Sequence, residues 1–322
     1  MRILITGANG FVGRALARRL ADAAVLDGRP IEALHLLDLG FETPPAAPAQ
    51  TWAVDLGDAA ALQPALDRIR AAGPLSHVFH LASIPGGLAE QQPDLAQRVN
   101  IAATLALLEH GRAQAEAGHA PPVFVFASSI AVLGELTGPV DDHTPPQPVM
   151  GYGAHKWVGE ILVAAHSRRG WVDGRSLRLP GVLARPPART GQLSAFLSDM
   201  LRELAAGRPF VCPMSAQAST WASSLPCVID QLLHAATLDA RALAVLGTSR
   251  CVTLPTLRFA MAELVDAVAA VHGVAARDLV RHAPEPRIEA WFGRFPPLHT
   301  PAAEDAGFGR DADLQALVRA AL

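Results

Sequence analysis

Residues 2–13 read Arg-Ile-Leu-Ile-Thr-Gly-Ala-Asn-Gly-Phe-Val-Gly, and this stretch decides the fold. Residues 2–6 form a short apolar run typical of a strand, and apolar residues recur at helical spacing from position 11 onward. Glycines between a strand and a helix let the backbone approach a pyrophosphate, which the free N–H groups and dipole of the helix N-terminus stabilise. The spacing GxxGxxG is a variant of the dinucleotide fingerprint, although a plain turn is the alternative. The residues predicted to line the cofactor here are Gly7, Asn9, Gly10, Phe11, Val12 and Gly13.

The pattern of apolar runs after this turn alternates between strands and helices. Short strands are expected at 33–37, 52–54, 78–83, 123–127 and 176–180, and helices at 58–72 and 93–116. Such alternation builds a doubly wound parallel sheet that binds its ligand at the carboxyl ends of the strands. The fold class is therefore α/β, with a Rossmann-type sheet.

An acidic residue follows the second predicted strand. Asp38 lies about 20–25 residues beyond the glycines, where a carboxylate suits hydrogen bonds to a ribose diol and repels a 2′-phosphate. No arginine follows to receive such a phosphate, so Asp38 favours NAD over NADP; an ordinary aspartate at a strand end is the alternative. Asp55 and Leu56, after the third strand, are expected to contact the adenine.

The only tyrosine and the only lysine of the chain, Tyr152 and Lys156, stand four residues apart. On a helix this spacing places both on one face. An ammonium group beside a phenol stabilises the phenolate and lowers the pKa of the phenol, so the pair is suited to proton transfer. Ser129, at the end of the fifth strand, can hold a substrate oxygen while Tyr152 takes its proton. Each residue alone also fits a purely structural role, which for Ser129 means a serine in a turn.

Bulk properties exclude several classes of protein. The 322 residues carry a net charge of −3 and no basic run, which argues against nucleic-acid binding. No apolar run is long enough for a transmembrane helix, and the N-terminus lacks the pattern of a signal peptide. Three widely spaced cysteines indicate reduced thiols and no metal site. We expect a cytoplasmic protein.

Taken together, these motifs resemble the extended short-chain dehydrogenase/reductase family, the NAD-dependent epimerase/dehydratase group. The resemblance implies that Ser129 is the catalytic serine, that Tyr152 is the base and that Lys156 adjusts the pKa of Tyr152. By analogy with that family, we also expect a homodimer. Further cofactor contacts that it implies are Leu81, Ala82, Ser83, Asn100, Tyr152, Lys156, Pro180 and Val182.

The second half of the chain is predicted to form a cap that binds the substrate. We expect a cofactor domain of residues 1–179 plus about 221–247, with a helix at 225–237, and a cap of about 180–220 plus 248–322, with helices at 256–272 and 312–321. Runs such as 167–180 and 211–213 look like the D-erythronate dehydrogenase branch of the family, which implies oxidation of the C2 hydroxyl of a short sugar acid to the 2-keto acid. Ser83, Ser129, Tyr152 and Arg185 are the predicted substrate contacts, with Arg185 as the candidate for the carboxylate or simply a solvated loop arginine. A nucleotide-sugar epimerase or reductase and a non-catalytic NAD-sensing protein are the alternatives.

Overall fold

The computed structural model describes residues 1–41, 49–186 and 195–322. Its centre is a seven-stranded sheet in which every neighbouring pair of strands is parallel. The strands, in the order in which they lie in the sheet, are β12 (Cys251–Thr253), β8 (Asp173–Leu179), β7 (Val123–Ser129), β6 (His77–His80), β1 (Arg2–Thr6), β4 (Ala33–Asp38) and β5 (Ala49–Ala53). The predicted doubly wound α/β sheet is thus confirmed.

The strand order reverses at β1. From β1 the chain proceeds outward through β4 and β5, and then returns to the other side of β1 with β6. In such sheets the ligand binds at this reversal, outside the carboxyl ends of the two central strands. The glycine turn follows β1 and residues 81–83 follow β6, so both segments lie at the reversal point.

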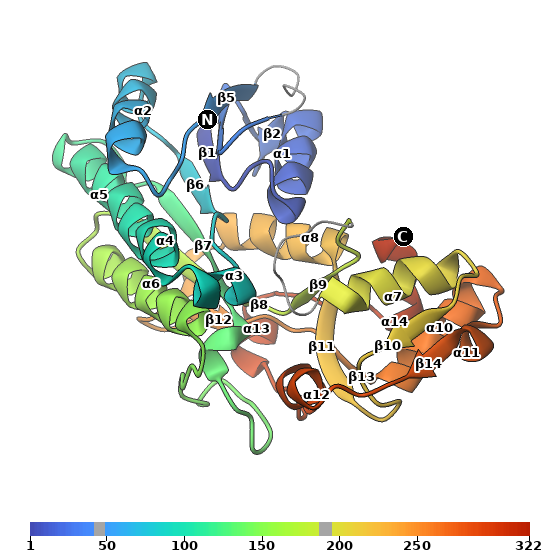
Figure 1. The fold of residues 1–322 in the computed structure, drawn as a ribbon. Coiled ribbons are helices and arrows are strands. Elements are labelled where there is room, and N and C mark those ends of the chain that lie inside the picture. The colour runs from blue at the N-terminus through green and yellow to red at the C-terminus, as the bar shows by residue number, and fades with distance from the viewer. Residues whose placement is uncertain (42–48, 187–194) are drawn as a thin grey trace.

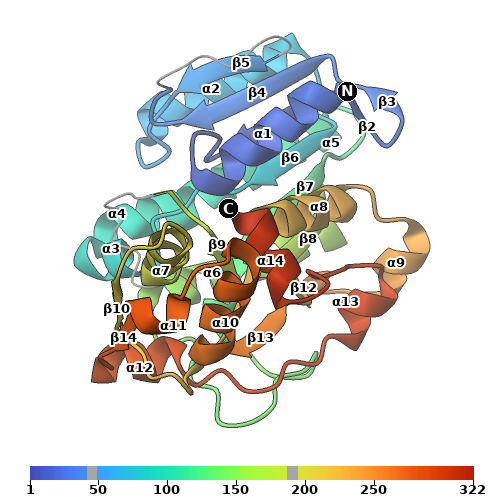
Figure 2. The same cartoon turned by 90° about the vertical axis from the view of Figure 1, so that its right-hand side faces the viewer.

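Helices cover both faces of the sheet (Figures 1 and 2). One face carries α1 (Phe11–Ala23) and α8 (Leu225–Ala236), and the other carries α2 (Ala59–Ala72), α5 (Ala103–Glu116) and α6 (Gly151–Arg168). Each face has its own apolar cluster, with Leu16 and Leu232 in the first and Leu66 and Leu107 in the second. Burial of these side chains is the main force that holds the layers together.

A smaller unit follows the sheet in sequence and lies at the right of Figure 1. It contains two small sheets, β13-β11-β9 and β10-β14. Its elements are β9 (Gly181–Leu183), α7 (Ala195–Ala205), β10 (Phe210–Cys212), β11 (Ser219–Ser224), β13 (Leu257–Ala260), α10 (Met261–His272), α11 (Ala276–Leu279), β14 (Val280–His282) and α14 (Leu314–Ala321). A separate apolar cluster, with Met200, Leu264 and Val318 fully buried, packs these helices together.

Short elements complete the chain. They are β2 (Val25–Leu26), β3 (Arg29–Pro30), α3 (Gly86–Gln91), α4 (Pro93–Gln97), η1 (Arg98–Ala102), η2 (Ile130–Leu133), α9 (Ala240–Val245), α12 (Pro286–Phe292) and α13 (Pro301–Asp305). The single helix predicted at 93–116 is interrupted by η1, one turn of π-helix. Residues 41–50 are rich in proline and alanine, which predicts an exposed loop. Residues 42–48 lie outside the described residues, and residues 49 and 50 already belong to β5.

Two predictions for the second half are wrong. The helix expected at 256–272 begins only at Met261, because residues 257–260 pair antiparallel with β11. Residues 251–253, assigned to the cap, instead form the edge strand β12 of the central sheet. The remainder of the two-domain division stays a prediction.

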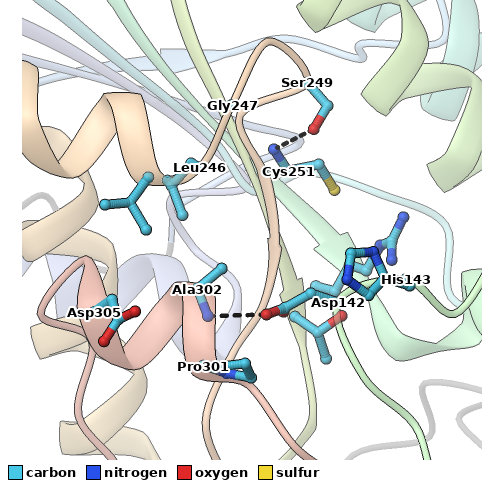
Figure 3. A pocket seen from close by; sticks show the side chains of 12 residues that line it. Asp142, His143, Leu246, Gly247, Ser249, Cys251, Pro301, Ala302 and Asp305 are labelled. Carbon is cyan, nitrogen blue, oxygen red and sulfur yellow. Dashed lines mark hydrogen bonds between the residues drawn. The ribbon is translucent and has the colours of Figure 1, made fainter.

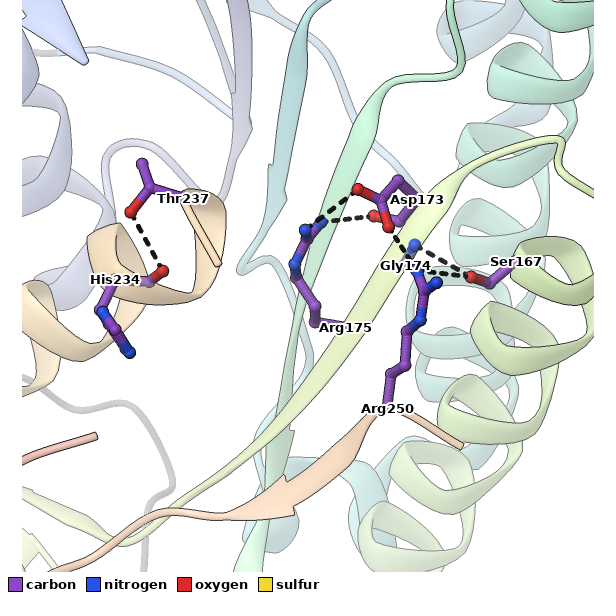
Figure 4. Close-up of polar contacts among 7 residues, drawn as sticks. All are labelled: Ser167, Asp173, Gly174, Arg175, His234, Thr237 and Arg250. Atoms are coloured by element: carbon purple, nitrogen blue, oxygen red, sulfur yellow. Dashed lines mark hydrogen bonds and ion pairs between the residues drawn. The ribbon is translucent and has the colours of Figure 1, made fainter. Parts of the chain in front are cut away.

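Polar contacts attach β12 to the base of the sheet (Figure 4). Asp173, the first residue of β8, accepts hydrogen bonds from Arg175 (3.0 Å) and from Arg250, which stands just before β12. Arg250 also reaches the Ser167 hydroxyl on α6. Because Arg175 is almost fully buried, its pairing with Asp173 offsets the cost of burying the charge.

Candidate functional site

The glycine turn at the start of α1 is built for close approach. Gly7 has φ of +68°, and a Cβ atom on it would lie 2.7 Å from the Ala82 nitrogen. A Cβ on Gly13 would lie 2.0 Å from the Gly7 carbonyl oxygen. The helix is capped by Gly10, which forms no side-chain capping hydrogen bond. The exposed turn, with Phe11 and Val12 half-buried beside it, fits a bound pyrophosphate.

Asp38 faces this turn from the end of β4. Its Oδ2 accepts a hydrogen bond from the Asn9 nitrogen at 2.7 Å, and its Oδ1 accepts one from Leu39 at 2.8 Å. The Asn9 side chain donates in turn to the Gly40 carbonyl at 2.8 Å. A fixed carboxylate beside the turn fits the ribose diol of NAD.

The adenine contacts predicted after the third strand have clear structural roles. Asp55 Oδ1 accepts from the Gly57 nitrogen at 2.7 Å and so shapes the turn before α2. Leu56 is buried in the apolar cluster of the α2 face. The structure places both near the carboxyl end of β5, and their contact with adenine remains a prediction.

Asn100 positions the segment that follows β6. Its side chain exchanges hydrogen bonds with the backbone of Ile84, at 2.7 Å as acceptor and 3.1 Å as donor. This residue lies in η1, and a π-turn inside a helix is frequent at functional sites. Asn100 thus fixes the end of the segment 81–84, whose start is fixed by a hydrogen bond from the Leu81 nitrogen to the Thr6 carbonyl of β1 at 3.2 Å.

His80, at the end of β6, is a packed imidazole. Its two ring nitrogens pair with the Thr6 hydroxyl at 2.6 Å and the Thr104 hydroxyl at 2.8 Å. Burial lowers its pKa to about 3, so the ring is neutral. A neutral ring with both nitrogens hydrogen-bonded to hydroxyls has no place in proton transfer.

Tyr152 lies in the first turn of α6 and is half-buried. The hydroxyls of Ser129 and Ser83 hydrogen-bond to its phenol, and the positive charge of Arg185 acts on it electrostatically. Burial raises the pKa of Tyr152, and these three groups act in the opposite direction. The expectation of a lowered pKa is therefore wrong for this structure, because desolvation of the phenolate outweighs its polar neighbours.

Lys156 lies one helical turn after Tyr152 on α6 and is buried. Its Nζ donates to the Ala127 carbonyl at 2.6 Å and stands 5.7 Å from the centre of the Tyr152 ring. Burial lowers the pKa of Lys156 to about 7, against the opposing effect of Glu160. The structure thus brings Ser129, Tyr152 and Lys156 together, while their catalytic roles remain a prediction.

Arg185 reaches the same place from the far end of β9. Its guanidinium lies 5.1 Å from the centre of the Phe11 ring, at the start of α1, and interacts electrostatically with Tyr152. The backbone that carries it is fixed by a hydrogen bond from the Arg185 nitrogen to the Ser198 hydroxyl at 2.9 Å. Pro180 and Val182, the other predicted contacts here, flank the crossing from β8 to β9. Arg185 thus packs against the start of α1 and acts electrostatically on Tyr152, while its contact with a substrate remains a prediction.

The sequence model of the NAD dependent epimerase/dehydratase family matches residues 3–219. The chain belongs to this family. It is 37% identical to the D-erythronate dehydrogenase of Cupriavidus necator, over 99% of this chain and 97% of that protein. It is 30% identical to the D-erythronate dehydrogenase of Haemophilus influenzae, over 99% and 98% of the two chains. The crystal structure of the nucleoside-diphosphate-sugar epimerase from Agrobacterium tumefaciens superposes with a TM-score of 0.88 at 30% identity, covering 99% of this chain and 92% of that one.

Membership in the epimerase/dehydratase family confirms three predictions made from the sequence. The chain is an enzyme, its class is that of the NAD-dependent dehydrogenases, and its cofactor is NAD. The glycine turn and Asp38 are consistent with that cofactor, because the turn leaves room for a pyrophosphate and the carboxylate suits a ribose diol.

Sequence reasoning missed two sets of polar contacts around α6. Glu90 on α3 accepts a hydrogen bond from the Gly151 nitrogen at 2.6 Å and so caps the helix that carries Tyr152. Glu160 accepts from the Ser128 hydroxyl at 2.5 Å and binds Arg178 through both carboxylate oxygens at 2.9 Å. The sequence signal for Glu160 was its place four residues after Lys156, which continues the same helix face.

A cavity of about 460 Å³ opens beyond Arg178, at the edge of the sheet (Figure 3). Its wall includes Cys251 of β12, Asp142 and His143 of the loop before α6, and Asp305 of α13. None of the predicted catalytic residues lines this cavity.

The described residues show neither a membrane span nor a metal cluster. No helix among them is both long and apolar enough to span a bilayer. No cluster of three histidine, cysteine or acidic side chains in residues 1–41, 49–186 and 195–322 is arranged to bind a metal ion.

Proposed function

We propose that this chain is an NAD-dependent dehydrogenase that oxidises the C2 hydroxyl of a short sugar acid, similar to D-erythronate, to the 2-keto acid. Two relatives that match over nearly their whole length are D-erythronate dehydrogenases. The observation that carries the proposal is the group of side chains around Tyr152. The Ser129 and Ser83 hydroxyls hydrogen-bond to the phenol, and the Arg185 guanidinium acts on it electrostatically, which suits a substrate with both an alcohol and a carboxylate.

In this mechanism Tyr152, as phenolate, takes the proton of the C2 hydroxyl. Ser129 donates a hydrogen bond to the same oxygen and so fixes the alcohol against the base. NAD, when bound, accepts the hydride that leaves C2, so that the products are the 2-keto acid, NADH and one proton. Lys156 stabilises the negative charge on Tyr152 by its position one turn below.

Arg185 would hold the substrate carboxylate. Its guanidinium is packed over Phe11 and is partly removed from water, so an ion pair with a carboxylate gains more than it would at an exposed site. A second guanidinium is present in the cap, where Arg258 of β13 donates to the Ser219 hydroxyl at 3.1 Å. Arg185 is the one that faces the phenol.

The proposal is tested by a spectrophotometric screen of aldonates, uronates and UDP-sugars with NAD and with NADP. We expect NADH to form with D-erythronate or a close aldonate. The Arg185→Gln variant should raise KM for the acid at least about tenfold, since it loses a charge-assisted hydrogen bond. Arg208→Gln, an exposed arginine of the cap paired with Glu203, is the matched control and should leave KM unchanged. Activity confined to UDP-sugars would refute the proposal.

The second candidate is a nucleotide-sugar epimerase or reductase. Its support is the similarity to the nucleoside-diphosphate-sugar epimerase of Agrobacterium tumefaciens over 99% of this chain. The same screen decides between the two, because an epimerase converts a UDP-sugar without net formation of NADH. A non-catalytic NAD-sensing protein would bind NAD and turn over neither class of substrate.

We also propose that the protein is a homodimer in the cytoplasm. Three large apolar side chains are exposed on the neighbouring helices α5 and α6, namely Leu105, Trp157 and Ile161, and they would be covered by a second copy. The three cysteines are free thiols, as in proteins of a reducing compartment. Light scattering after size-exclusion chromatography measures the mass, and a mass near 33.8 kDa would contradict the dimer.

A further inference from the structure

Glu160 is a buried carboxylate on the face of α6 that carries Tyr152 and Lys156. The three residues are spaced four apart, so each stands about one helical turn from the next. Only 5% of Glu160 is exposed, and 3% of Lys156. A carboxylate this deeply buried is costly unless it is paired and hydrogen-bonded.

The contacts of Glu160 fix it against the two strands that lie under the catalytic helix. The Ser128 hydroxyl of β7 donates a hydrogen bond to Oε1 at 2.5 Å. Arg178 of β8 forms a bidentate ion pair, with Nε and Nη2 each 2.9 Å from a carboxylate oxygen. Ser128 lies between Ala127 and Ser129 on β7. The Ala127 carbonyl accepts a hydrogen bond from the Lys156 ammonium at 2.6 Å. Glu160 is thereby held to the strand that carries both the anchor of Lys156 and the catalytic serine.

Among the described residues, the other groups near Lys156 supply no negative charge. From the sheet, the Phe126 ring lies 4.9 Å from Nζ, and His80 is kept neutral by burial, which lowers its pKa. Tyr152 is a neutral phenol because burial raises its pKa.

Beyond Glu160 lie the Arg178 guanidinium and the Cys251 thiol of β12, whose pKa burial raises. On its own helix, the His155 ring has a pKa lowered by burial and points to Asn100 at 3.5 Å. Glu160 is the acidic group that raises the pKa of Lys156.

We infer that Glu160 is a positioning residue that keeps Lys156 protonated, with Ser128 and Arg178 holding the carboxylate in place. Through the charge of Lys156, Glu160 helps to stabilise the phenolate of Tyr152. This catalytic part of its role rests on the proposed function. The ion pair with Arg178 leaves the carboxylate charged and fixed in direction, one turn from the ammonium.

The chain allows a direct measurement, because it contains one lysine and one tyrosine. Labelling with [13Cε]lysine and [13Cζ]tyrosine gives one NMR signal for each, and their titration reports the two pKa values without assignment. Glu160→Gln should lower the pKa of Lys156 by about 1 or more, a tenfold change in its ionisation constant. Glu160→Asp keeps the charge and should restore most of the value.

The double variant Glu160→Gln/Arg178→Gln removes both charges and leaves no unpaired buried ion, so it tests the inference even if the single variant does not fold. It should also lower the pKa of Lys156. Glu109→Gln is the matched control, since Glu109 contacts α6 only at His166, ten residues beyond Lys156. It should leave the titration unchanged.

An unchanged Lys156 titration in both Gln variants would overturn the inference. So would an equal shift in the Asp and Gln variants, which would indicate a merely structural contact. The pH profile of kcat/KM should follow the NMR result, with its acidic limb displaced to higher pH in Glu160→Gln. If the pKa of Lys156 shifts in the variants but no tested substrate reduces NAD, the proposed function fails. The electrostatic effect of Glu160 on Lys156 would then still hold.

Discussion

Substitution of Gly13 by alanine tests the cofactor turn. The added Cβ would lie 2.0 Å from the Gly7 carbonyl oxygen and 2.8 Å from the Ala8 Cα, where ordinary contact begins at 3.4 Å. Both neighbours are backbone atoms at the end of β1, so no side chain can rotate away. The helix must therefore move by more than about 1 Å, which strains the packing of Leu16 and Leu20 beneath it.

The magnitude follows from two opposing effects. Overpacking of this kind costs about 3 kcal/mol, whereas alanine in a helix is favoured over glycine by about 1 kcal/mol. We expect the free energy of unfolding to fall by about 2 kcal/mol. The displaced helix N-terminus should weaken NAD binding more than tenfold, since a 1 Å error in position is enough to cost about 100-fold in a preorganised site.

Urea unfolding measures the stability, and calorimetric titration with NAD measures the dissociation constant. Gly138→Ala is the control, because a Cβ there meets nothing within 4 Å and the residue is exposed. Its stability should stay within about 0.5 kcal/mol of the parent. If Gly13→Ala matched this control in both measurements, the reasoning about the turn would be refuted.

Three further predictions concern charge and proton transfer. Tyr152→Phe should lower kcat by roughly 10²–10⁴ while the dissociation constant of NAD changes little, and a loss below tenfold would remove Tyr152 as the base. Asp38→Ala should raise KM for NAD about tenfold and reduce the preference over NADP, as measured by initial rates with both cofactors. Because burial lowers the pKa of Lys156 to about 7, the unfolded chain binds more protons above that pH, so the free energy of unfolding should rise between pH about 7 and 10. Lys156→Met should abolish this contribution, and an unchanged slope in urea unfolding would contradict it.

The parts of the fold that the sequence predicts are those with a strong local signature. The glycine turn and the alternating apolar runs after it predict β1, α1 and a parallel sheet, because the local pattern of each of these elements agrees with its place in the fold. Residues 257–260 look like the start of a helix, yet they pair with β11. That pairing joins residues about 40 positions apart along the chain, and no local pattern encodes it.

The electrostatics of the site were harder to predict than its members. Tyr152, Lys156 and Ser129 are recognisable from residue type and spacing. Burial raises the pKa of Tyr152 against the opposing effects of Ser129, Ser83 and Arg185, and burial is a property of the folded chain that local sequence does not encode. Glu160 reads in sequence as an ordinary helix glutamate, since glutamate is usually exposed, and only the three-dimensional contacts identify it as a buried ion.

Two glycines explain how α6, the helix that carries Tyr152 and Lys156, comes so close to β7 and to η2, which follows it. A Cβ on Gly153 would lie 2.3 Å from the Ala131 carbonyl oxygen, and one on Gly159 would lie 2.4 Å from the Phe126 ring. Each glycine lowers helix propensity by about 1 kcal/mol relative to alanine, so a helix under no other constraint would favour alanine at both positions. With larger residues α6 would stand away from β7, and Lys156 would lose the 2.6 Å contact with Ala127. The two glycines lower the stability of the helix itself, but they allow the close packing that places Tyr152, Lys156 and Glu160 against the sheet.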